Sequence, residues 1–165
     1  MLKYLLVLCI VLVLSSGFGA AQAAVCVEPA NLQGPRPLQE QTAKAAIRDY
    51  LQSWQSFTIA FEQNRADMLD PAFVGTAKDK LTEAIQQQAT LGIRSRYHDR
   101  AHDLQIIFYS PEGLSIELTD SIEYDVEVLD HDTVKTAQRV HSRFMVILTP
   151  AEARWRVRVF QAVPE

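Results

Sequence analysis

Asp120 is the residue of this sequence whose position is best suited to chemistry. It stands in a regular alternation of apolar and polar residues, and its neighbours at even positions are Leu114, Ile116, Leu118, Ile122, Tyr124, Val126 and Val128. Residues two apart along a strand share a face, so this alternation places the Asp120 carboxylate on the face that meets the core. A carboxylate partly removed from water is a candidate for proton transfer. A bulge or a strand end would instead turn it to water or onto a backbone amide.

Three other side chains could support chemistry at Asp120. Tyr50, Tyr124 and His141 could hydrogen-bond to a substrate oxyanion, although strand alternation directs His141 outward. No second acid or base clearly converges on Asp120, which favours a structural role for it. The sequence also lacks a G-x-S-x-G motif, a P-loop, a paired C-x-x-C and a calcium loop. It therefore names no reaction, and we predict no cofactor.

His98 and His102 form an H-x-x-x-H pair, the spacing that places two zinc-binding imidazoles on one face of a helix. The residue after the first histidine is Asp99 rather than Glu, and Gly92 predicts that the preceding helix has already ended. On a strand, the two rings would lie roughly 13 Å apart, too far to share a metal ion. We therefore expect a polar loop here and predict no metal site.

Residues 1–23 have the layout of a secretory signal peptide. Lys3 supplies a positive charge, residues 4–14 form an apolar run, and Ala21-Gln22-Ala23 has the small-x-small pattern that signal peptidase recognises. We therefore expect an exported protein, either periplasmic or secreted. The alternative is an uncleaved membrane anchor, since the apolar run could reach spanning length if it continued through Phe18 and the alanines.

One cysteine, Cys26, follows this leader, because Cys9 lies inside it. The exported chain would then have no intramolecular disulfide. Lipidation of Cys26 is an alternative, but Ala23 and Val25 stand where a lipobox has a Leu-like residue and a Gly, Ala or Ser. Membrane attachment is thus expected only if the leader is retained or Cys26 is lipidated.

The charge of the chain argues against nucleic acid as a partner. The formal net charge is −4 at pH 7, from 16 basic and 20 acidic residues. Loss of Lys3 with the leader would make it −5, and no block of basic residues is present. An acidic chain without a basic patch lacks the electrostatic footprint of a nucleic-acid-binding protein.

We expect residues 24–36 to form a flexible tether and residues 37–165 to form one domain. The tether carries Pro29, Gly34 and Pro35 and shows no periodicity. Two helices are predicted to begin the domain. One starts at Pro37 and carries an apolar stripe through Phe61, and the other starts at Asp70-Pro71 and ends at Gly92.

Four strands are predicted to follow the helices, joined as a meander. Their centres are residues 104–108, 114–128, 140–148 and 155–159. The second strand directs an acidic row to solvent, and the last two direct a basic row. These rows are Glu117, Glu123, Asp125 and Glu127, and Arg139, Arg143, Arg154, Arg156 and Arg158. Side by side, they would favour one register of the sheet rather than a phosphate site.

This order of elements resembles the NTF2-like, cystatin-like superfamily of α+β cones, in an exported form of bacterial type. The resemblance rests on the aromatic stripe Tyr50-Leu51-Trp54-Phe57-Phe61, the alternating strand 114–128 and the closing hairpin with Trp155. It implies two N-terminal helices packed on a curved four-stranded antiparallel sheet. The superfamily includes isomerases, dehydratases, binding modules and secretion-apparatus subunits, and some members place an acidic general base inside the cone.

The resemblance leaves three functions open. The first is an exported non-catalytic binding domain for a protein partner or a small apolar ligand, with Trp54, Phe57, Phe61, Phe144 and Trp155 as candidate pocket residues that could equally be core. The second is a cofactor-free lyase or isomerase with Asp120 as general base. The third is a membrane-anchored subunit of a secretion assembly. A homodimer through the sheet face is possible, although the charged rows oppose it.

Overall fold

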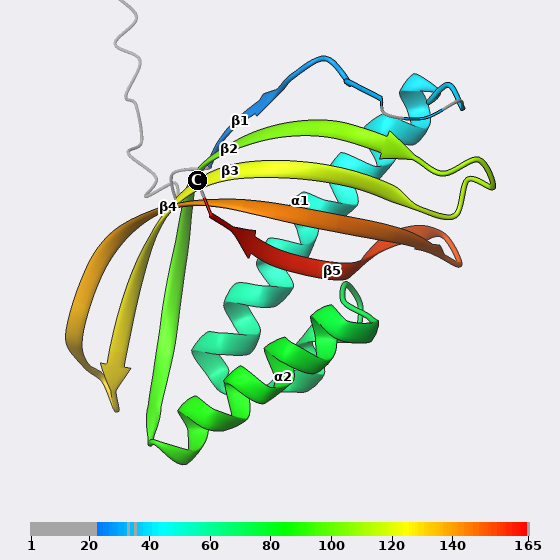
Figure 1. Ribbon diagram of the computed structural model, residues 1–165. Coiled ribbons are helices and arrows are strands. Elements are labelled where there is room, and N and C mark those ends of the chain that lie inside the picture. Colours follow the sequence, from blue (N-terminus) through cyan, green and yellow to red (C-terminus); the bar gives the residue numbers. More distant parts are fainter. Residues whose placement is uncertain (1–22, 33, 35, 165) are drawn as a thin grey trace, which may run out of the picture.

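The computed structural model describes residues 23–164 apart from 33 and 35, and this part of the chain contains two long helices and five strands (Figure 1). The elements are β1 Ala24–Val27, α1 Glu40–Gln63, a 3-10 helix Ala66–Leu69, α2 Gly75–Thr90, β2 Ile93–Tyr109, β3 Ile116–Asp130, β4 Thr133–Ala151 and β5 Arg154–Val163. Within the described residues, no helix is both long and apolar enough to cross a membrane. Residues 1–22 of the predicted signal peptide lie outside the described part of the chain.

The first helix forms because apolar side chains recur every three or four residues along it. Its buried residues are Ala46, Asp49, Tyr50, Ser53, Trp54, Phe57, Ala60 and Phe61. The helix begins at Glu40 and ends at Gln63, where Asn64 adopts a left-handed conformation and its backbone N–H donates to the Ala60 carbonyl. The aromatic stripe predicted from the sequence is therefore the face that α1 buries.

The second helix begins later than the sequence predicted. Asp70 and Pro71 lie in a turn, and α2 starts at Gly75. Residues 72–74, which precede α2, instead form backbone hydrogen bonds with the sheet. The backbone N–H of Val74 donates to the Val157 carbonyl over 2.9 Å, and the N–H of Val157 donates to the Ala72 carbonyl over 2.8 Å. Residues 72–74 therefore pair with the outer edge of β5 at Val157.

The sheet has the strand order β1-β2-β3-β4-β5, with β1 parallel to β2 and the other neighbours antiparallel. The α+β class is confirmed, with one strand more than the predicted four. The extra strand forms because residues 24–27 pair with residues 101–104 of β2. The prediction of a polar loop around His98 was wrong, because β2 begins at Ile93 and includes His98.

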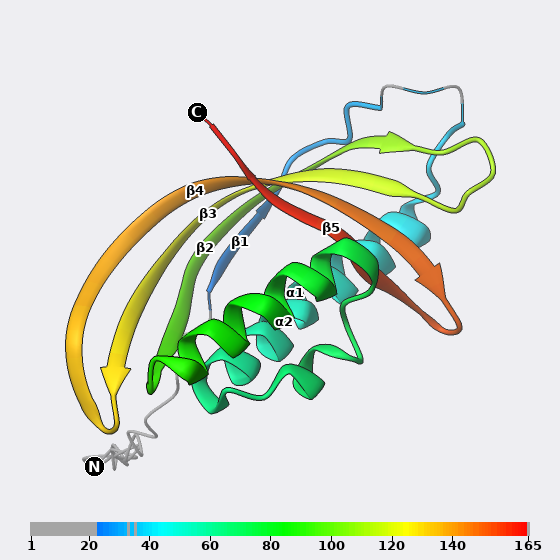
Figure 2. The same ribbon diagram turned by 60° about the horizontal axis from the view of Figure 1, so that its bottom comes forward.

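The sheet curves around the helices, which lie on its concave side (Figure 2). Register shifts between Asp99 and Ala101 in β2 and between Ile147 and Leu148 in β4 accompany this curvature. The core lies between the helices and the concave face. Its largest fully buried apolar side chains are Tyr50, Leu69, Phe73, Ile85, Leu104, Ile116, Leu118, Ile122, Leu129, Val146 and Leu148.

Candidate functional site

Asp120 lies at the centre of a buried polar cluster inside the cone. Its Oδ2 atom accepts a hydrogen bond from the Tyr50 hydroxyl over 2.7 Å and lies 2.8 Å from Nδ1 of His102. Asp120 is 0% exposed, Tyr50 is 0% exposed and His102 is 2% exposed. The structure therefore brings together two of the predicted candidates, Asp120 and Tyr50, and adds His102. We call these three residues the Asp120 cluster.

The register of the sheet explains this meeting. Asp120 of β3 pairs with Leu104 of β2, and His102 precedes Leu104 by two residues on the same face. Sequence reasoning missed His102 because the run from Arg94 to Asp103 is polar. A signal was nevertheless present, because the alternation of Ile106 and Leu104 continues backward onto His102.

The Asp120 cluster contains an ion pair. His102 directs Nδ1 at Asp120 and Nε2 at Asp99, the second over 3.4 Å, so both ring nitrogens meet oxygens that only accept. Burial alone would lower the pKa of His102, but the hydrogen bonds to Asp120 and Asp99 outweigh it and raise that pKa from 6.5 to about 9. Burial and the nearby Asp120 charge raise the pKa of Tyr50 well above its usual value. The raised pKa values favour a protonated imidazole at His102 and a neutral phenol at Tyr50 beside Asp120.

Aromatic rings fill the cone beside the Asp120 cluster. The Trp54 ring lies 5.4 Å from the His102 ring and 5.7 Å from Phe160. Phe144 stacks on Phe160 at 4.4 Å with an interplanar angle of 5°. Asp120 Oδ1 and Trp54 Nε1 are buried in this packing without a hydrogen-bond partner among the described residues. The interior of the cone is thus closely packed around Asp120.

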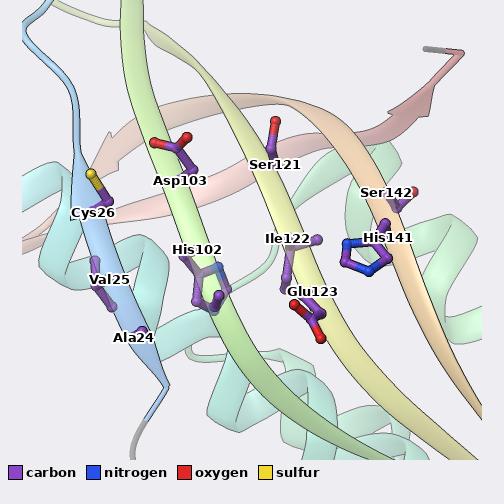
Figure 3. A pocket seen from close by; sticks show the side chains of 11 residues that line it. Ala24, Val25, Cys26, His102, Asp103, Ser121, Ile122, Glu123, His141 and Ser142 are labelled. Carbon is purple, nitrogen blue, oxygen red and sulfur yellow. The ribbon is translucent and has the colours of Figure 1, made fainter.

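The other two candidates for chemistry lie apart from Asp120. Tyr124 packs its ring 6.2 Å from Trp54 and 5.8 Å from Tyr97, and burial raises its pKa. His141 lies on the outer face of the sheet, as the alternation predicted (Figure 3). The structure therefore does not join Tyr124 or His141 to the Asp120 cluster.

His141 borders a shallow hollow of about 440 Å³ on the outer face. In Figure 3 the side chains of Asp103, Ser121 and His141 lie on the side of the sheet away from the helices. Cys26 also borders this hollow, and its thiol is exposed and forms no disulfide within the described part. Among residues 23–164 without 33 and 35, no three His, Cys, Asp or Glu side chains are grouped closely enough to hold a metal ion.

The aromatic residues proposed as pocket residues belong mostly to the core. Trp54, Phe57 and Phe61 are buried, and Phe144 packs against that core. Trp155 is half-buried and borders a small surface hollow of about 210 Å³. Whether any of them contacts a ligand stays a prediction.

A larger hollow lies at the edge of the cone, between α1 and the inner face of the first two strands, and His102 of the Asp120 cluster is among its lining residues. Its volume is about 800 Å³. We call it the α1–β1 groove, and its lining residues are Ala23, Val25, Val27, Lys44, Ile47, Arg48, Leu51, Gln52, Gln55, Asp99 and His102. Val25 and Val27 sit opposite His102 and Leu104, on the inner face of the sheet, yet they are 47% and 49% exposed. The helix layer therefore stops short of β1 and leaves apolar side chains of the inner face in contact with solvent.

The sequence could not reveal the α1–β1 groove. Its strand side comes from the segment predicted as a tether, and its helix side comes from Ile47 and Leu51, which belong to the stripe predicted as core. Apolar residues of α1 that extend beyond the edge of the sheet have the same helical spacing as those that pack under it, so the sequence does not distinguish the two. Only the position of β1 at the edge of the sheet distinguishes a covered side chain from an open one.

Comparisons with known proteins give matches in structure but not in sequence. No protein-family model matches the chain, and no curated protein sequence matches it significantly. The intermembrane space region of the chloroplast protein ARC6 is similar in structure, with a TM-score of 0.62, 15% identity and coverage of 79% of this chain and 100% of that one. A periplasmic fragment of TraM has a TM-score of 0.51, 14% identity and coverage of 72% and 98%.

A candidate enzyme has a similar architecture as well. A candidate scytalone dehydratase from Novosphingobium aromaticivorans gives a TM-score of 0.53 at 9% identity, covering 76% of this chain and 89% of that one. At such identities the likeness concerns the fold alone. A candidate dehydratase of the NTF2-like family from Streptomyces avermitilis also matches, with a TM-score of 0.51 at 9% identity and coverage of 74% of this chain and 98% of that one, and the chain accordingly has an NTF2-like fold.

Proposed function

We propose that this NTF2-like domain is an exported, non-catalytic binding domain, and that it receives a protein partner in the α1–β1 groove. The observation that carries the proposal is the contrast between a closely packed cone and an open apolar groove beside it. Val25 and Val27 face inward from the sheet and remain about half exposed. Apolar side chains that a fold leaves open in this way are typical of interaction sites.

The composition of the α1–β1 groove supports a protein partner. Its floor combines Val25 and Val27 with Ile47 and Leu51 of α1, and its helix side carries polar and charged residues such as Gln52. An apolar centre with a polar border is the usual anatomy of a protein–protein interface. The predicted signal peptide supplies the expectation of export, and the similar regions of ARC6 and TraM come from an intermembrane space and a periplasm.

Photo-crosslinking in the native host tests this proposal. A photoreactive amino acid at Gln52, which lines the groove, should capture a defined partner. Val25→Asp, which places a charge in the apolar floor, should abolish capture. Leu91→Asp is the matched control, because Leu91 is 72% exposed at the end of α2 and does not line the groove. Capture that survives Val25→Asp, or that is lost equally in Leu91→Asp, would contradict the proposed site.

A second candidate function is supported by the convergence of Asp120, His102 and Tyr50. This arrangement would suit a cofactor-free lyase or isomerase in which Asp120 acts as general base, and dehydratases are among the proteins of similar structure. A general base must come within hydrogen-bonding distance of the proton that it removes, and Asp120 is 0% exposed. The enzymatic function therefore requires the cone to open.

Quenching of Trp54 fluorescence distinguishes the two functions. In a Trp155→Phe variant the remaining tryptophan, Trp54, reports on the interior of the cone, where it is 3% exposed. A binding domain with a closed cone should protect Trp54 from acrylamide. Efficient quenching in the native state would favour the lyase or isomerase.

A further inference from the structure

The two edges of the sheet differ in how their backbone groups are used. At the β5 edge, residues 72–74 pair with the strand at Val157, and residues 133–142 of β4 extend beyond the pairing with β5. At the β1 edge, the described residues include no backbone hydrogen bond from the outer side. An uncovered strand edge presents a row of donors and acceptors that can pair with another chain.

The direction of the free groups on β1 follows from its pairing with β2. The backbone N–H of Glu28 donates to the Leu104 carbonyl over 2.8 Å, so Glu28 and the residues two and four before it direct their backbone groups to β2. The residues between them, Val25 and Val27, therefore direct N–H and C=O away from the sheet. Their side chains meanwhile point into the α1–β1 groove.

The α1–β1 groove has a length that fits a short strand. Its lining along α1 runs from Lys44 to Gln55, which corresponds to about 16 Å of helix. An extended chain covers this distance with about five residues. Alternate residues of such a segment would face the groove beside Val25 and Val27, while its backbone would lie against the free edge of β1.

Charge distinguishes a partner segment from a second copy of this chain. The charged residues that line the groove from α1, Lys44 and Arg48, are both basic; each pairs with a carboxylate of its own helix, Glu40 or Asp49, and their side chains stay 74% and 60% exposed. The acidic residue of the lining, Asp99, lies on the strand side and contacts His102. In a symmetric antiparallel pairing of two β1 strands, the two helices would lie on the same side of the joined sheet, and their basic residues would face each other. An occupant with carboxylates beside its apolar side chains would instead complement this rim.

We propose that an extended segment of a partner protein adds to the outer edge of β1 as a further strand, with apolar side chains entering the α1–β1 groove and a carboxylate beside Lys44 and Arg48. The inference rests on the proposed function, because it specifies how the partner occupies that groove. Main-chain hydrogen bonds supply affinity in this mode of recognition, and the alternate side chains supply specificity.

Synthetic peptides test the inference. The probes have about seven residues, with Val, Leu, Phe or Glu at the second, fourth and sixth positions and Thr between them. Fluorescence anisotropy with the exported form of the chain should favour peptides that carry two apolar residues and one Glu. Replacing that Glu by Lys should weaken binding by about tenfold, as expected for losing an attractive charge contact and gaining a repulsive one.

Backbone methylation of the tightest peptide separates strand addition from other ways of filling the groove. N-methylation of the amides on one edge of the peptide should reduce affinity by more than about tenfold, while N-methylation of the other edge should change it less than about twofold. Val25→Pro, which removes one outward N–H, should also weaken binding, whereas Val25→Thr keeps that N–H and should retain most of the affinity. Circular dichroism and thermal unfolding verify that both variants fold.

Each contrary outcome has a distinct meaning. Equal binding of both methylated peptides, with sensitivity to Leu51→Asp retained, would overturn strand addition and leave the groove as the binding site. Binding that ignores Leu51→Asp would overturn the site itself. Absence of binding by every peptide would overturn the inference. So would a dimer in sedimentation that Val25→Pro dissociates, because the occupant would then be a second copy.

Discussion

The Asp120 cluster and the α1–β1 groove share one residue, His102, but they differ in burial, charge and polarity. The cluster is buried, charged and internally paired, with Asp120 bonded to both Tyr50 and His102. The groove is open, and its floor is apolar. The polar residues that look most like a catalytic site in the sequence are thus enclosed, while the open site is made of residues that look like ordinary core. Burial rather than residue type separates the two.

The largest expected effect comes from breaking the ion pair of the Asp120 cluster. Asp120→Asn should lower the free energy of unfolding by about 3–5 kcal/mol, because it removes the nearer of the two carboxylates that contact the buried His102. Urea unfolding measures the change. Asp103→Asn, on an exposed side chain one residue after His102, is the control and should change stability by less than about 0.5 kcal/mol. Equal effects of the two variants would show that the cluster does not contribute as a buried pair.

The next effect is a dependence of stability on pH. Because the pKa of His102 is raised from 6.5 to about 9 on folding, its contribution is complete below pH 6.5 and is lost as the pH rises through about 9. The free energy of unfolding should therefore fall by on the order of 3 kcal/mol between pH 6 and pH 10. Urea titrations across this range in the wild type and in His102→Gln provide the test. A fall of the same size in both proteins would mean that His102 is not the group responsible.

A smaller effect is expected at the phenol of the Asp120 cluster. Tyr50→Phe keeps the ring and removes the hydroxyl that donates to Asp120. A hydrogen bond to a charged acceptor contributes about 1.5–3 kcal/mol, so the variant should unfold with a free energy lower by about 2 kcal/mol. A combined Tyr50→Phe, Asp120→Asn variant should lose less than the sum of the two single losses, because both changes affect one cluster. Strict additivity would argue against that coupling.

A substitution in the α1–β1 groove should have the smallest effect on the free energy of unfolding and the largest effect on partner binding. Val25→Asp changes a side chain that is 47% exposed at the edge of the sheet, so the free energy of unfolding should change by less than about 0.5 kcal/mol. Crosslinking at Gln52 should nevertheless be lost in this variant. A large loss of stability would place Val25 among the core residues and would remove the contrast between the two regions.

Much of the fold and part of the site could be predicted from the sequence. The alternation around Asp120 is strict because β3 has one face on the core and one in solvent, so its inward position followed from periodicity alone. The helical stripe ending at Phe61 was equally clear. Both signals arise from a single element, and neither depends on knowing the neighbours.

The parts that sequence reasoning missed depend on contacts between elements. His102 lies in a polar run, and only its pairing beside Asp120 and Tyr50 makes burial of an imidazole favourable. Strand β1 is only four residues long, Ala24–Val27, and pairs in parallel with β2 far along the chain. The α1–β1 groove arises where α1 ceases to cover the sheet. None of these features has a periodicity of its own.

The most direct measurement of the central claim compares the two regions in one nuclear magnetic resonance experiment on the partner complex. Two-dimensional amide spectra of the 15N-labelled chain report the backbone amides of Val25 and Val27 and the indole N–H of Trp54. Addition of the partner captured through Gln52 should shift and protect the two valine amides and leave the Trp54 indole unchanged. A shift of the Trp54 indole with unchanged valine amides would contradict the account, because the partner would then bind inside the cone.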